Sequence, residues 1–328
     1  MANYKTLKGF KVRSVSSDPT VDVGQLWYNT TSNTLKFDSY GTAGAWSTGG
    51  DMNEGRPGIA GGGSATAAFA VGGGPSGPYK ANMELYDGTS WTEVANCSVA
   101  TDYLAACGTP TAAFKFGGNG TIDSTELFNG TAWSAGGALN TGVQQQGGYG
   151  VVTAAIACAG LSSTPNGFML VTQEYNGVGW TNLPSLNTGR KYMQAGGTST
   201  SGICGPGATT GATVIGNVEL YNGTSWSTTT SVGTARASYG MAKQGTNTAS
   251  LIFAGNKPAS SATICEQWNG TGWTEVADVS FGTQELTGSG VSTGDALKFG
   301  GNDPGGYTDS TEEWAGVAPA VVKTVTVS

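Results

Sequence analysis

The fold is decided by the stretch Glu219-Leu220-Tyr221-Asn222-Gly223-Thr224-Ser225-Trp226, whose pattern is typical of a strand, a tight turn and a second strand. Asn222-Gly223 favours the turn because both residues tolerate a positive φ at little steric cost. The same eight-residue pattern recurs along the chain. Its other copies are Glu84–Trp91, Glu126–Trp133, Gln173–Trp180, Glu266–Trp273 and the truncated Glu312–Gly316. The rest of the sequence is spaced around these copies.

The copies follow one another at a nearly constant interval. Their turn glycines are Gly88, Gly130, Gly177, Gly223, Gly270 and Gly316, which lie 42, 47, 46, 47 and 46 residues apart. Each interval also holds a segment of small residues and an apolar strand that ends in glycine, so each unit has four short strands. This period and strand number are typical of a β-propeller, in which stacked blades bury one another's faces. The many Thr, Ser, Val and aromatic residues likewise predict an all-β fold.

Residues 54–316 resemble kelch repeats. The resemblance rests on an apolar strand ending in Gly-Gly, as at Gly72-Gly73, followed by a Glu-x-Tyr strand, a turn and a Trp. It implies a kelch-like β-propeller that binds its ligands where strand starts and loops surround the channel mouth. Because the Trp recurs so regularly, we expect it to pack between blades, and we expect the repeated Glu to form ion pairs or hydrogen bonds within its own repeat. The structural Trp residues are Trp46, Trp91, Trp133, Trp180, Trp226 and Trp273.

Two closures of the propeller stay open. In the favoured one, a hairpin within residues 21–50 and the C-terminal strand pair, so that the N- and C-terminal segments complete a seventh blade. In the alternative, only the Trp46 strand completes the last of six blades, and the hairpin stands outside as an attachment module. Either closure predicts that removing residues 318–328 destabilises the ring. The predicted segments are a polar lead-in at 1–20, the hairpin module at 21–50, the propeller at 51–317 and the C-terminal strand at 318–328.

Composition argues against several classes of function. The 328-residue chain has a net charge of −7 with 15 Lys and Arg, so we expect no nucleic-acid partner. It contains no His, so the usual general base and most zinc and copper ligands are missing, and we expect no metal or cofactor. The apolar runs are only strand-sized and the start of the chain is polar, so we expect neither membrane insertion nor a signal peptide. The five Cys are predicted to be unpaired core thiols.

Candidate binding residues lie where the repeats differ, at the starts of the innermost strands around the channel mouth. Arg, Tyr, Gln and Asp side chains there would suit a glycan or a protein epitope. The candidates are Arg56, Asp102, Tyr103, Gln144, Tyr149, Arg190, Tyr192, Arg236, Tyr239 and Gln284. The alternative interpretation is a solvated rim without a ligand. The variable loops between the second and third strands of each unit are further candidates.

The stretch Gly24–Phe37, followed by Trp46, resembles a short module near the start of many bacteriophage tail-fibre and other virion proteins. The resemblance implies a non-enzymatic structural protein, made in the host cytoplasm and placed in the virion in multiple copies, as a tail, tail-fibre or decoration protein. Its N-terminal segment would bind other virion proteins, and its propeller would face a host-surface glycan or protein.

Two alternatives stay open. One is a glycan-active enzyme, a glycosidase or lyase that uses carboxylates outside the repeat pattern. Its candidate carboxylates are Asp102, Asp123, Glu285, Asp303 and Asp309. The other alternative is an intracellular kelch-type adaptor that binds proteins.

Overall fold

The structure is a computed structural model of the 328-residue chain. It describes residues 6–7, 10–20, 25–39, 43–74, 78–162, 170–209, 212–257, 260–316 and 321–325. Parts of the predicted segments 1–20, 21–50, 51–317 and 318–328 therefore lie outside the described residues. The described residues form strands and turns without an α-helix, which confirms the all-β prediction.

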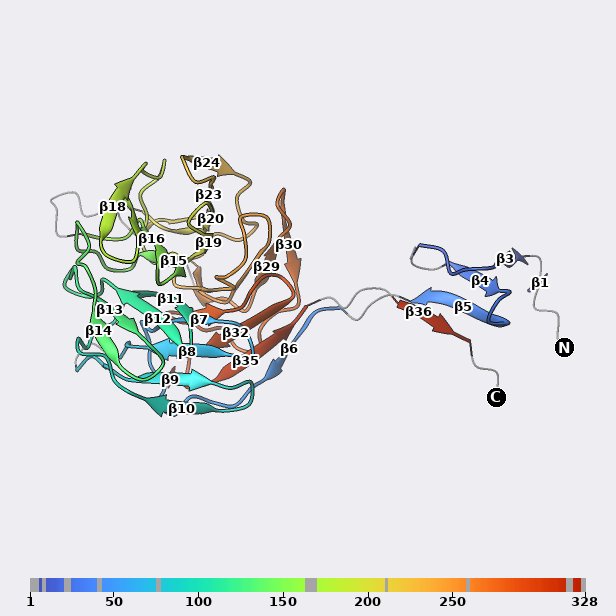
Figure 1. Ribbon diagram of the computed structural model, residues 1–328, viewed down its shortest axis with the longest axis horizontal. Coiled ribbons are helices and arrows are strands. Elements are labelled where there is room, and N and C mark those ends of the chain that lie inside the picture. The colour runs from blue at the N-terminus through green and yellow to red at the C-terminus, as the bar shows by residue number, and fades with distance from the viewer. Residues whose placement is uncertain are drawn as a thin grey trace. The chain divides into compact units, whose positions relative to one another are not determined.

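The chain divides into two compact units (Figure 1). The large unit is Ala45–Ala315, and the small unit combines Met1–Gly44 with Gly316–Ser328. The large unit begins at Ala45 rather than at the predicted residue 51, because strand β6 (Ala45–Thr48) pairs with strand β35 (Thr311–Ala315).

Four-stranded antiparallel sheets fill the large unit, and its described residues form six of them. Three sheets, each from its inner to its outer strand, are β7 (Ala60–Gly63), β8 (Ala68–Val71), β9 (Met83–Tyr86) and β10 (Trp91–Val94); β11 (Ala105–Thr109), β12 (Ala112–Phe116), β13 (Thr125–Phe128) and β14 (Trp133–Ala135); and β15 (Gly147–Val151), β16 (Ala154–Cys158), β17 (Thr172–Tyr175) and β18 (Trp180–Leu183). The other three are β19 (Ala195–Thr198), β20 (Ser201–Cys204), β23 (Val218–Tyr221) and β24 (Trp226–Thr229); β25 (Gly240–Met241), β26 (Ser250–Phe253), β29 (Cys265–Trp268) and β30 (Trp273–Val276); and β31 (Thr287–Ser289), β32 (Asp295–Phe299), β35 and β6.

The inner strands of neighbouring sheets lie side by side, as Figure 1 shows for β7, β11, β15 and β19 near the middle of the large unit. The spacing is too tight for most side chains. A Cβ atom on Gly148 would lie 2.6 Å from the ring of Phe116 and 2.7 Å from Cβ of Ala105. The predominance of Gly and Ala in these strands therefore follows from close packing at the centre.

A cycle of backbone hydrogen bonds joins the six sheets at the starts of their inner strands. Ahead of each inner strand lies one residue with a φ between 51° and 64°. Its N–H donates to the carbonyl of the equivalent residue in the preceding sheet. The donors and acceptors, with N···O distances, are Tyr103 to Gly58 at 2.8 Å, Gln145 to Tyr103 at 2.8 Å, Tyr192 to Gln145 at 3.0 Å, Ser238 to Tyr192 at 2.7 Å, Glu285 to Ser238 at 3.0 Å and Gly58 to Glu285 at 2.8 Å. We name these six residues the central ring.

Buried ion pairs connect strands inside most sheets. Arg56 pairs with Glu84 at 2.7 Å, Lys115 with Glu126 at 2.7 Å and Lys298 with Glu312 at 2.8 Å, and the partners are at most 4% exposed. Arg190 with Glu219 and Arg236 with Glu266 form equivalent pairs. The repeated Glu thus forms ion pairs within its own repeat, which confirms that prediction.

The turn of the repeated stretch is stabilised by its Asn. Oδ1 of Asn222 accepts hydrogen bonds from the backbone N–H groups of Thr224 and Ser225, both at 2.9 Å, and from the Thr224 hydroxyl at 2.8 Å. Gly223 follows with a φ of 91°, a conformation that glycine adopts without strain. The predicted hairpin turn is therefore confirmed, but only Gly223 takes the positive φ expected of both residues, and Asn222 acts through its side chain instead.

The Trp at the end of the repeated stretch packs between sheets, as predicted. Trp180 lies 5.8 Å from Phe114 and 5.0 Å from Phe116 of the preceding sheet, measured between ring centroids. Trp226 donates from Nε1 to Oγ1 of Thr172 in the preceding sheet at 3.0 Å. These residues therefore hold the sheets against one another and are not exposed platforms for sugars.

The sixth sheet combines both ends of the large unit. Strand β6 is its outer strand, and Trp46 lies opposite Trp314 with ring centroids 5.5 Å apart. Trp46 therefore supplies the Trp that the truncated copy Glu312–Gly316 lacks. The N-terminal hairpin and the C-terminal strand do pair, but their sheet belongs to the small unit. The Trp46 strand therefore pairs with the truncated last repeat, while the hairpin pairs with the C-terminal strand.

The small unit is a four-stranded sheet of β3 (Arg13–Val15), β4 (Leu26–Asn29), β5 (Thr34–Ser39) and β36 (Val321–Thr324), with a separate pair β1 (Thr6–Leu7) and β2 (Phe10–Lys11). Asp18 is its polar centre. Its carboxylate accepts hydrogen bonds from Lys36 at 2.7 Å, Asn29 at 2.7 Å and Trp27 at 3.1 Å. The bonds from Lys36 and Asn29 lower the pKa of Asp18 to about 2.

Candidate functional site

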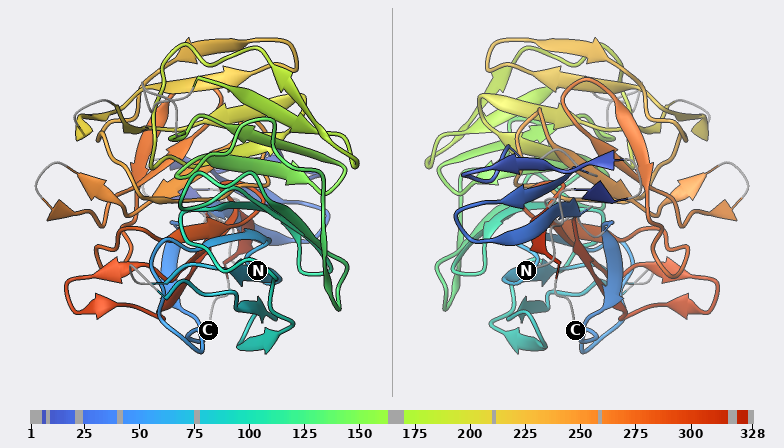
Figure 2. Two further views of the ribbon diagram at one scale, coloured as in Figure 1. Left: turned by 90° about the vertical axis from the view of Figure 1, so that its left-hand side faces the viewer. Right: turned by 90° about the vertical axis from the view of Figure 1, so that its right-hand side faces the viewer.

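The starts of the inner strands and the variable loops share one end of the large unit. Because the strands alternate in direction, the links from the second to the third strand and from each sheet to the next lie at the same end as the central ring. We name this end the ring face. Three of the links form short hairpins, β21 (Gly207–Ala208) with β22 (Val214–Ile215), β27 (Asn256–Lys257) with β28 (Ser260–Ser261) and β33 (Asn302–Asp303) with β34 (Gly306–Tyr307). Figure 2 shows these hairpins projecting from one side.

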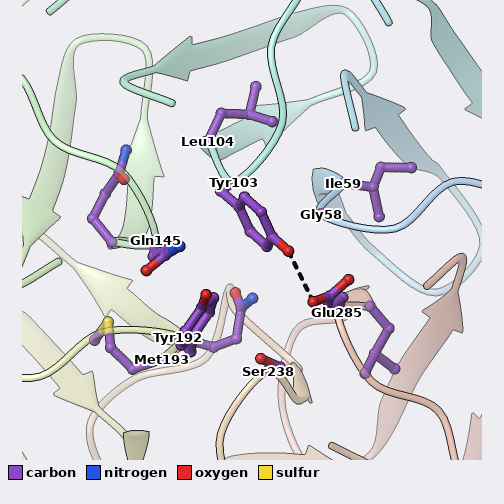
Figure 3. Close-up of a pocket in the computed structure, with 12 residues that line it drawn as sticks. Gly58, Ile59, Tyr103, Leu104, Gln145, Tyr192, Met193, Ser238 and Glu285 are labelled. Carbon is purple, nitrogen blue, oxygen red and sulfur yellow. Dashed lines mark hydrogen bonds between the residues drawn. The ribbon is translucent and has the colours of Figure 1, made fainter. Parts of the chain in front are cut away.

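A small hollow opens over the central ring, with a cavity volume of about 40 Å³. We name it the central hollow. Its walls are the six residues of the central ring and the residues that follow them in the chain. The lining residues are Gly58, Ile59, Tyr103, Leu104, Gln145, Gln146, Tyr192, Met193, Gln194, Ser238, Glu285 and Leu286. Apolar side chains form part of the lining, while tyrosines, amides, a hydroxyl and one carboxylate supply its polar groups (Figure 3).

Tyr103 leans across the ring toward Glu285. Its hydroxyl donates to Oε1 of Glu285 at 2.8 Å, as the dashed line in Figure 3 shows. Gly58 lies between the two in ring order, with a φ of 64°. On the other side, Tyr103 meets Tyr192 edge to face, with ring centroids 5.7 Å apart. Two aromatic rings and a carboxylate from three sheets thus converge in the hollow.

Glu285 contributes negative charge to the hollow. Burial raises the pKa of Tyr103, and the nearby charge of Glu285 raises it further. Burial and the charge of Glu285 raise the pKa of Tyr192 in the same way. Both phenols are therefore neutral hydrogen-bonding groups at physiological pH. Among the described lining residues none is Lys or Arg.

Asp102 lies beside the hollow, next to Tyr103 in the chain. It is 4% exposed, and burial raises its pKa. Its Oδ1 atom is buried without a hydrogen-bond partner.

Three sequence candidates, Arg56, Arg190 and Arg236, are not at the hollow and must be corrected. Each guanidinium is fully buried and paired with the repeated Glu of its own sheet. Arg56 also donates to the carbonyls of Gly72 at 3.0 Å and Asn82 at 3.1 Å. The charges of these arginines are neutralised inside the sheets, so the side chains cannot contact a ligand in solution.

Tyr149 and Tyr239 must also be corrected, because both side chains are fully buried. The Tyr239 hydroxyl oxygen lies 3.2 Å from each of the carbonyl oxygens of Gln194 and Pro206, which accept its hydrogen bond. Tyr239 therefore belongs to the packing between sheets. Tyr149 packs close to Gly202 of the neighbouring sheet. They fill space between sheets where smaller residues stand in other repeats.

The remaining candidates lie at or next to the hollow. Tyr103 and Tyr192 line it, and Asp102 lies beside it. Gln144 and Gln284 each precede a residue of the central ring and bridge through their backbones to Leu161 and Asn302. Several of the predicted residues therefore lie one or two positions before the central ring.

Sequence reasoning missed Gln145, Gln146 and Ser238 as site residues and treated Glu285 only as a possible catalytic acid. A signal for the central ring was present. Tyr103, Gln145, Tyr192, Ser238 and Glu285 each lie 15 residues after the turn glycine of the preceding repeat. Counting from the turn, instead of from the start of each small-residue segment, would have identified the ring.

The described residues contain no group of three or more Cys, Asp or Glu side chains arranged to hold a metal ion. All five cysteines are free and buried, which confirms the prediction of unpaired core thiols. The described part of the chain has no helix with the length and apolarity that a membrane crossing needs. The sequence matches no protein-family model and no curated protein.

Proposed function

We propose that the large unit is a closed six-bladed propeller of the kelch type, that it is a non-enzymatic component of a bacteriophage virion, and that its ring face binds a glycan on the host surface. The cycle of hydrogen bonds in the central ring supports the closed six-bladed form, because its sixth member returns to the first. The central hollow is the observation that carries the binding function.

The chemistry of the hollow suits a saccharide. Sugar rings present apolar C–H faces bordered by hydroxyl groups, and Tyr103 and Tyr192 offer both ring surface and phenol groups. Gln145, Ser238 and Glu285 add amide, hydroxyl and carboxylate groups that can hydrogen-bond hydroxyls from different directions. These groups come from different sheets of a rigid scaffold, which is typical of a recognition site.

Exposed aromatic side chains also lie in links at the ring face. Among the described residues of the large unit, the exposed aromatic side chains are Tyr79, Phe281 and Tyr307, which are 37%, 63% and 56% exposed. All three lie in links on the ring face, and none lies at the opposite end. Such residues supply contact surface for a polymer longer than the hollow can hold, as expected for a polysaccharide.

The virion assignment rests on the resemblance of Gly24–Phe37 to the virion module. This stretch belongs to the small unit, which is a compact unit distinct from the large one. The small unit gathers residues from both chain ends into one sheet whose edge strands are β3 and β36. An edge strand can pair with a strand of another protein, so we assign attachment to other virion proteins to this unit. Many copies on one particle would strengthen weak glycan contacts through avidity.

The test measures adsorption of purified protein to host cells and binding to the extracted surface polysaccharide. We expect Tyr192→Ala to weaken polysaccharide binding about tenfold, which corresponds to about 1.4 kcal/mol. Val178→Ala, at a side chain 81% exposed at the opposite end of the unit, should bind as the parent does. Equal binding by the parent and Tyr192→Ala would refute the site, and absence of the protein from purified particles would refute the virion assignment.

The same samples address the enzyme alternative. Asp102 and Glu285 both lie at the hollow, so a glycosidase would have two carboxylates near one ligand. The appearance of new reducing ends in the polysaccharide after incubation would replace the binding function by a catalytic one. We expect none.

A further inference from the structure

The charges of the chain are divided unevenly between its two units. The small unit contains six Lys and Arg and three Asp, so its net charge is +3. The large unit contains nine Lys and Arg and 19 Asp and Glu, so its net charge is −10. The total of −7 therefore combines a basic unit with a strongly acidic one.

The basic residues of the small unit gather in its N-terminal segment. Four of the six precede Asp18, which is the first acidic residue of the chain. They are Lys5, Lys8, Lys11 and Arg13. Asp18 itself pairs with Lys36 at 2.7 Å, so this acid and this base neutralise each other. The excess positive charge therefore belongs to the segment that leads into strand β3.

Strand β3 lies at one edge of the small unit's sheet (Figure 1). Among the described strands it pairs with β4 alone, in parallel, with Arg13 opposite Trp27. Arg13 and Ser14 of this strand are both exposed. The outer backbone groups of an edge strand can pair with a strand of another protein, and the charges beside them select which strand that is.

We propose that β3 pairs with an exposed, acidic strand of another virion protein, which carries carboxylates on alternate residues. This inference rests on the proposed attachment to the virion, and it specifies the chemistry of the partner and the edge that meets it. Opposite charges across a strand pair add to the backbone pairing. An acidic partner also attracts the small unit and repels the large one, so both charges favour contact through the small unit.

A nucleic acid fits this distribution of charge less well. Duplex DNA carries one negative charge per about 1.7 Å, whereas carboxylates on alternate residues of a strand are about 6.8 Å apart. A polyanion as dense as DNA repels the acidic large unit strongly. A net charge of +3 is also small beside the roughly 6–10 phosphate contacts that a DNA-binding protein makes.

The test measures binding of the full-length protein to immobilised peptides at about 0.05 M salt, where charges are weakly screened. An end-capped peptide of Val-Glu repeats is compared with one of Val-Lys repeats, which has the same length and the same apolar residues. We expect the Val-Glu peptide to bind about tenfold more tightly or better. Arg13→Glu and Ser14→Glu should remove this preference. Thr324→Glu places a negative charge at an exposed position on β36, the opposite edge strand, and should keep it.

Each other outcome overturns the inference. Equal binding of the two peptides, or no binding of either, would show that the edge does not select an acidic strand. Equal losses for Ser14→Glu and Thr324→Glu would show that β3 is not the edge involved. Tighter binding to a short DNA duplex, or to vesicles of phosphatidylglycerol and phosphatidylcholine, would show that the partner is a nucleic acid or a membrane.

The number of copies in each purified particle separates this inference from the proposed function. We expect Arg13→Glu to lower that number about fivefold or more, and Thr324→Glu to leave it unchanged. If the parent and Arg13→Glu are present at the same level, the acidic partner is wrong while the virion assignment stands. If the parent itself is absent from particles, the virion assignment is wrong, whatever the peptides show.

Discussion

The buried ion pair between Arg56 and Glu84 allows a test of how much the pairing of charges inside a sheet contributes to stability. Replacing Arg56 by Val removes the cation from a carboxylate that is only 2% exposed. Oε1 of Glu84 then loses its donor, although Oε2 still accepts from the backbone N–H of Asn53 at 2.7 Å. Two carbonyls, of Gly72 and Asn82, also lose the guanidinium. We expect Arg56→Val to destabilise the large unit by about 3–5 kcal/mol, the usual cost of breaking a buried pair.

The third sheet shows how the same position works without charge. Gln173 stands where the other sheets have the repeated Glu, and Val143 stands at the position of Arg56. Oε1 of Gln173 accepts from the backbone N–H of Asn140 at 2.8 Å, as Glu84 accepts from Asn53. The double variant Arg56→Val with Glu84→Gln copies this neutral arrangement. We therefore expect it to recover most of the lost stability, with a coupling free energy of about 2 kcal/mol or more between the two positions.

Urea unfolding of the parent, both single variants and the double variant measures these differences through the midpoint at constant slope. The exposed pair of Lys80 with Glu54, at 2.6 Å, supplies the control, and Lys80→Met should change stability by less than about 0.5 kcal/mol. The reasoning is refuted if Arg56→Val costs less than about 1 kcal/mol, or if the double variant is as unstable as the sum of the single ones.

Three further predictions follow from the same structure. Trp46→Ala should destabilise the large unit by about 3–5 kcal/mol in urea unfolding, since it leaves a cavity against Phe253 and Trp314; a loss below about 1 kcal/mol would show that β6 does not close the sixth sheet. Removing residues 318–328 deletes β36 from the small unit, so scanning calorimetry should show the large unit melting unchanged, in contrast to the destabilisation that both closures predicted from the sequence; a lowered transition of the large unit would contradict this. Burial lowers the pKa of Lys243 from 10.5 to about 8, so the unfolded chain binds more protons than the folded chain between these pH values. The free energy of unfolding of the parent should therefore rise by up to about 3 kcal/mol relative to that of Lys243→Met as the pH rises from 8 to 10.5. A constant difference across that range would contradict the burial of a charged amine.

Local sequence patterns predicted the parts of the fold that depend on local physics. The Asn-Gly turn needs only a side chain that accepts from the backbone N–H groups two and three residues ahead and a glycine with positive φ, so Asn222-Gly223 could be recognised directly. The small residues of the inner strands and the regular Trp likewise reflect packing that every repeat shares. These features repeat because each sheet packs against its neighbours in the same way.

The closure was harder to predict because it depends on partners far apart in the chain. Trp46 pairs with Trp314, and the terminal hairpin pairs with Val321–Thr324, so both closures use strand-like segments of similar quality. A strand pattern gives the face and length of a strand but not its partner. The sequence alone therefore left the partners of both segments open.

The site was misplaced by a similar limit. Arg56 and Arg190 were attractive candidates because a positive charge near a channel mouth is typical of recognition. Their burial becomes clear only from their pairing with the Glu on the third strand of the same sheet. The charge balance of each repeat does carry this information. Where the first Arg is absent, Lys115 or Lys298 in the second strand pairs with the repeated Glu. In the third sheet, Gln173 replaces the Glu. Reading the repeats together would have assigned the arginines to the core.

The backbone of the central ring gives an independent reason to look for function there. All six ring residues have a φ between 51° and 64°, a conformation that glycine adopts freely and other residues adopt at a cost of about 1–2 kcal/mol each. Only Gly58 is glycine, although glycine at the other five positions would preserve the hydrogen-bonded cycle, which uses backbone atoms alone. The chain instead carries Tyr, Gln, Tyr, Ser and Glu there, while it repeats the same residues at its turns and ion pairs. Strain accepted at five positions, with a different side chain at nearly every one, supports the proposed binding site, because a ligand there would contact these side chains together.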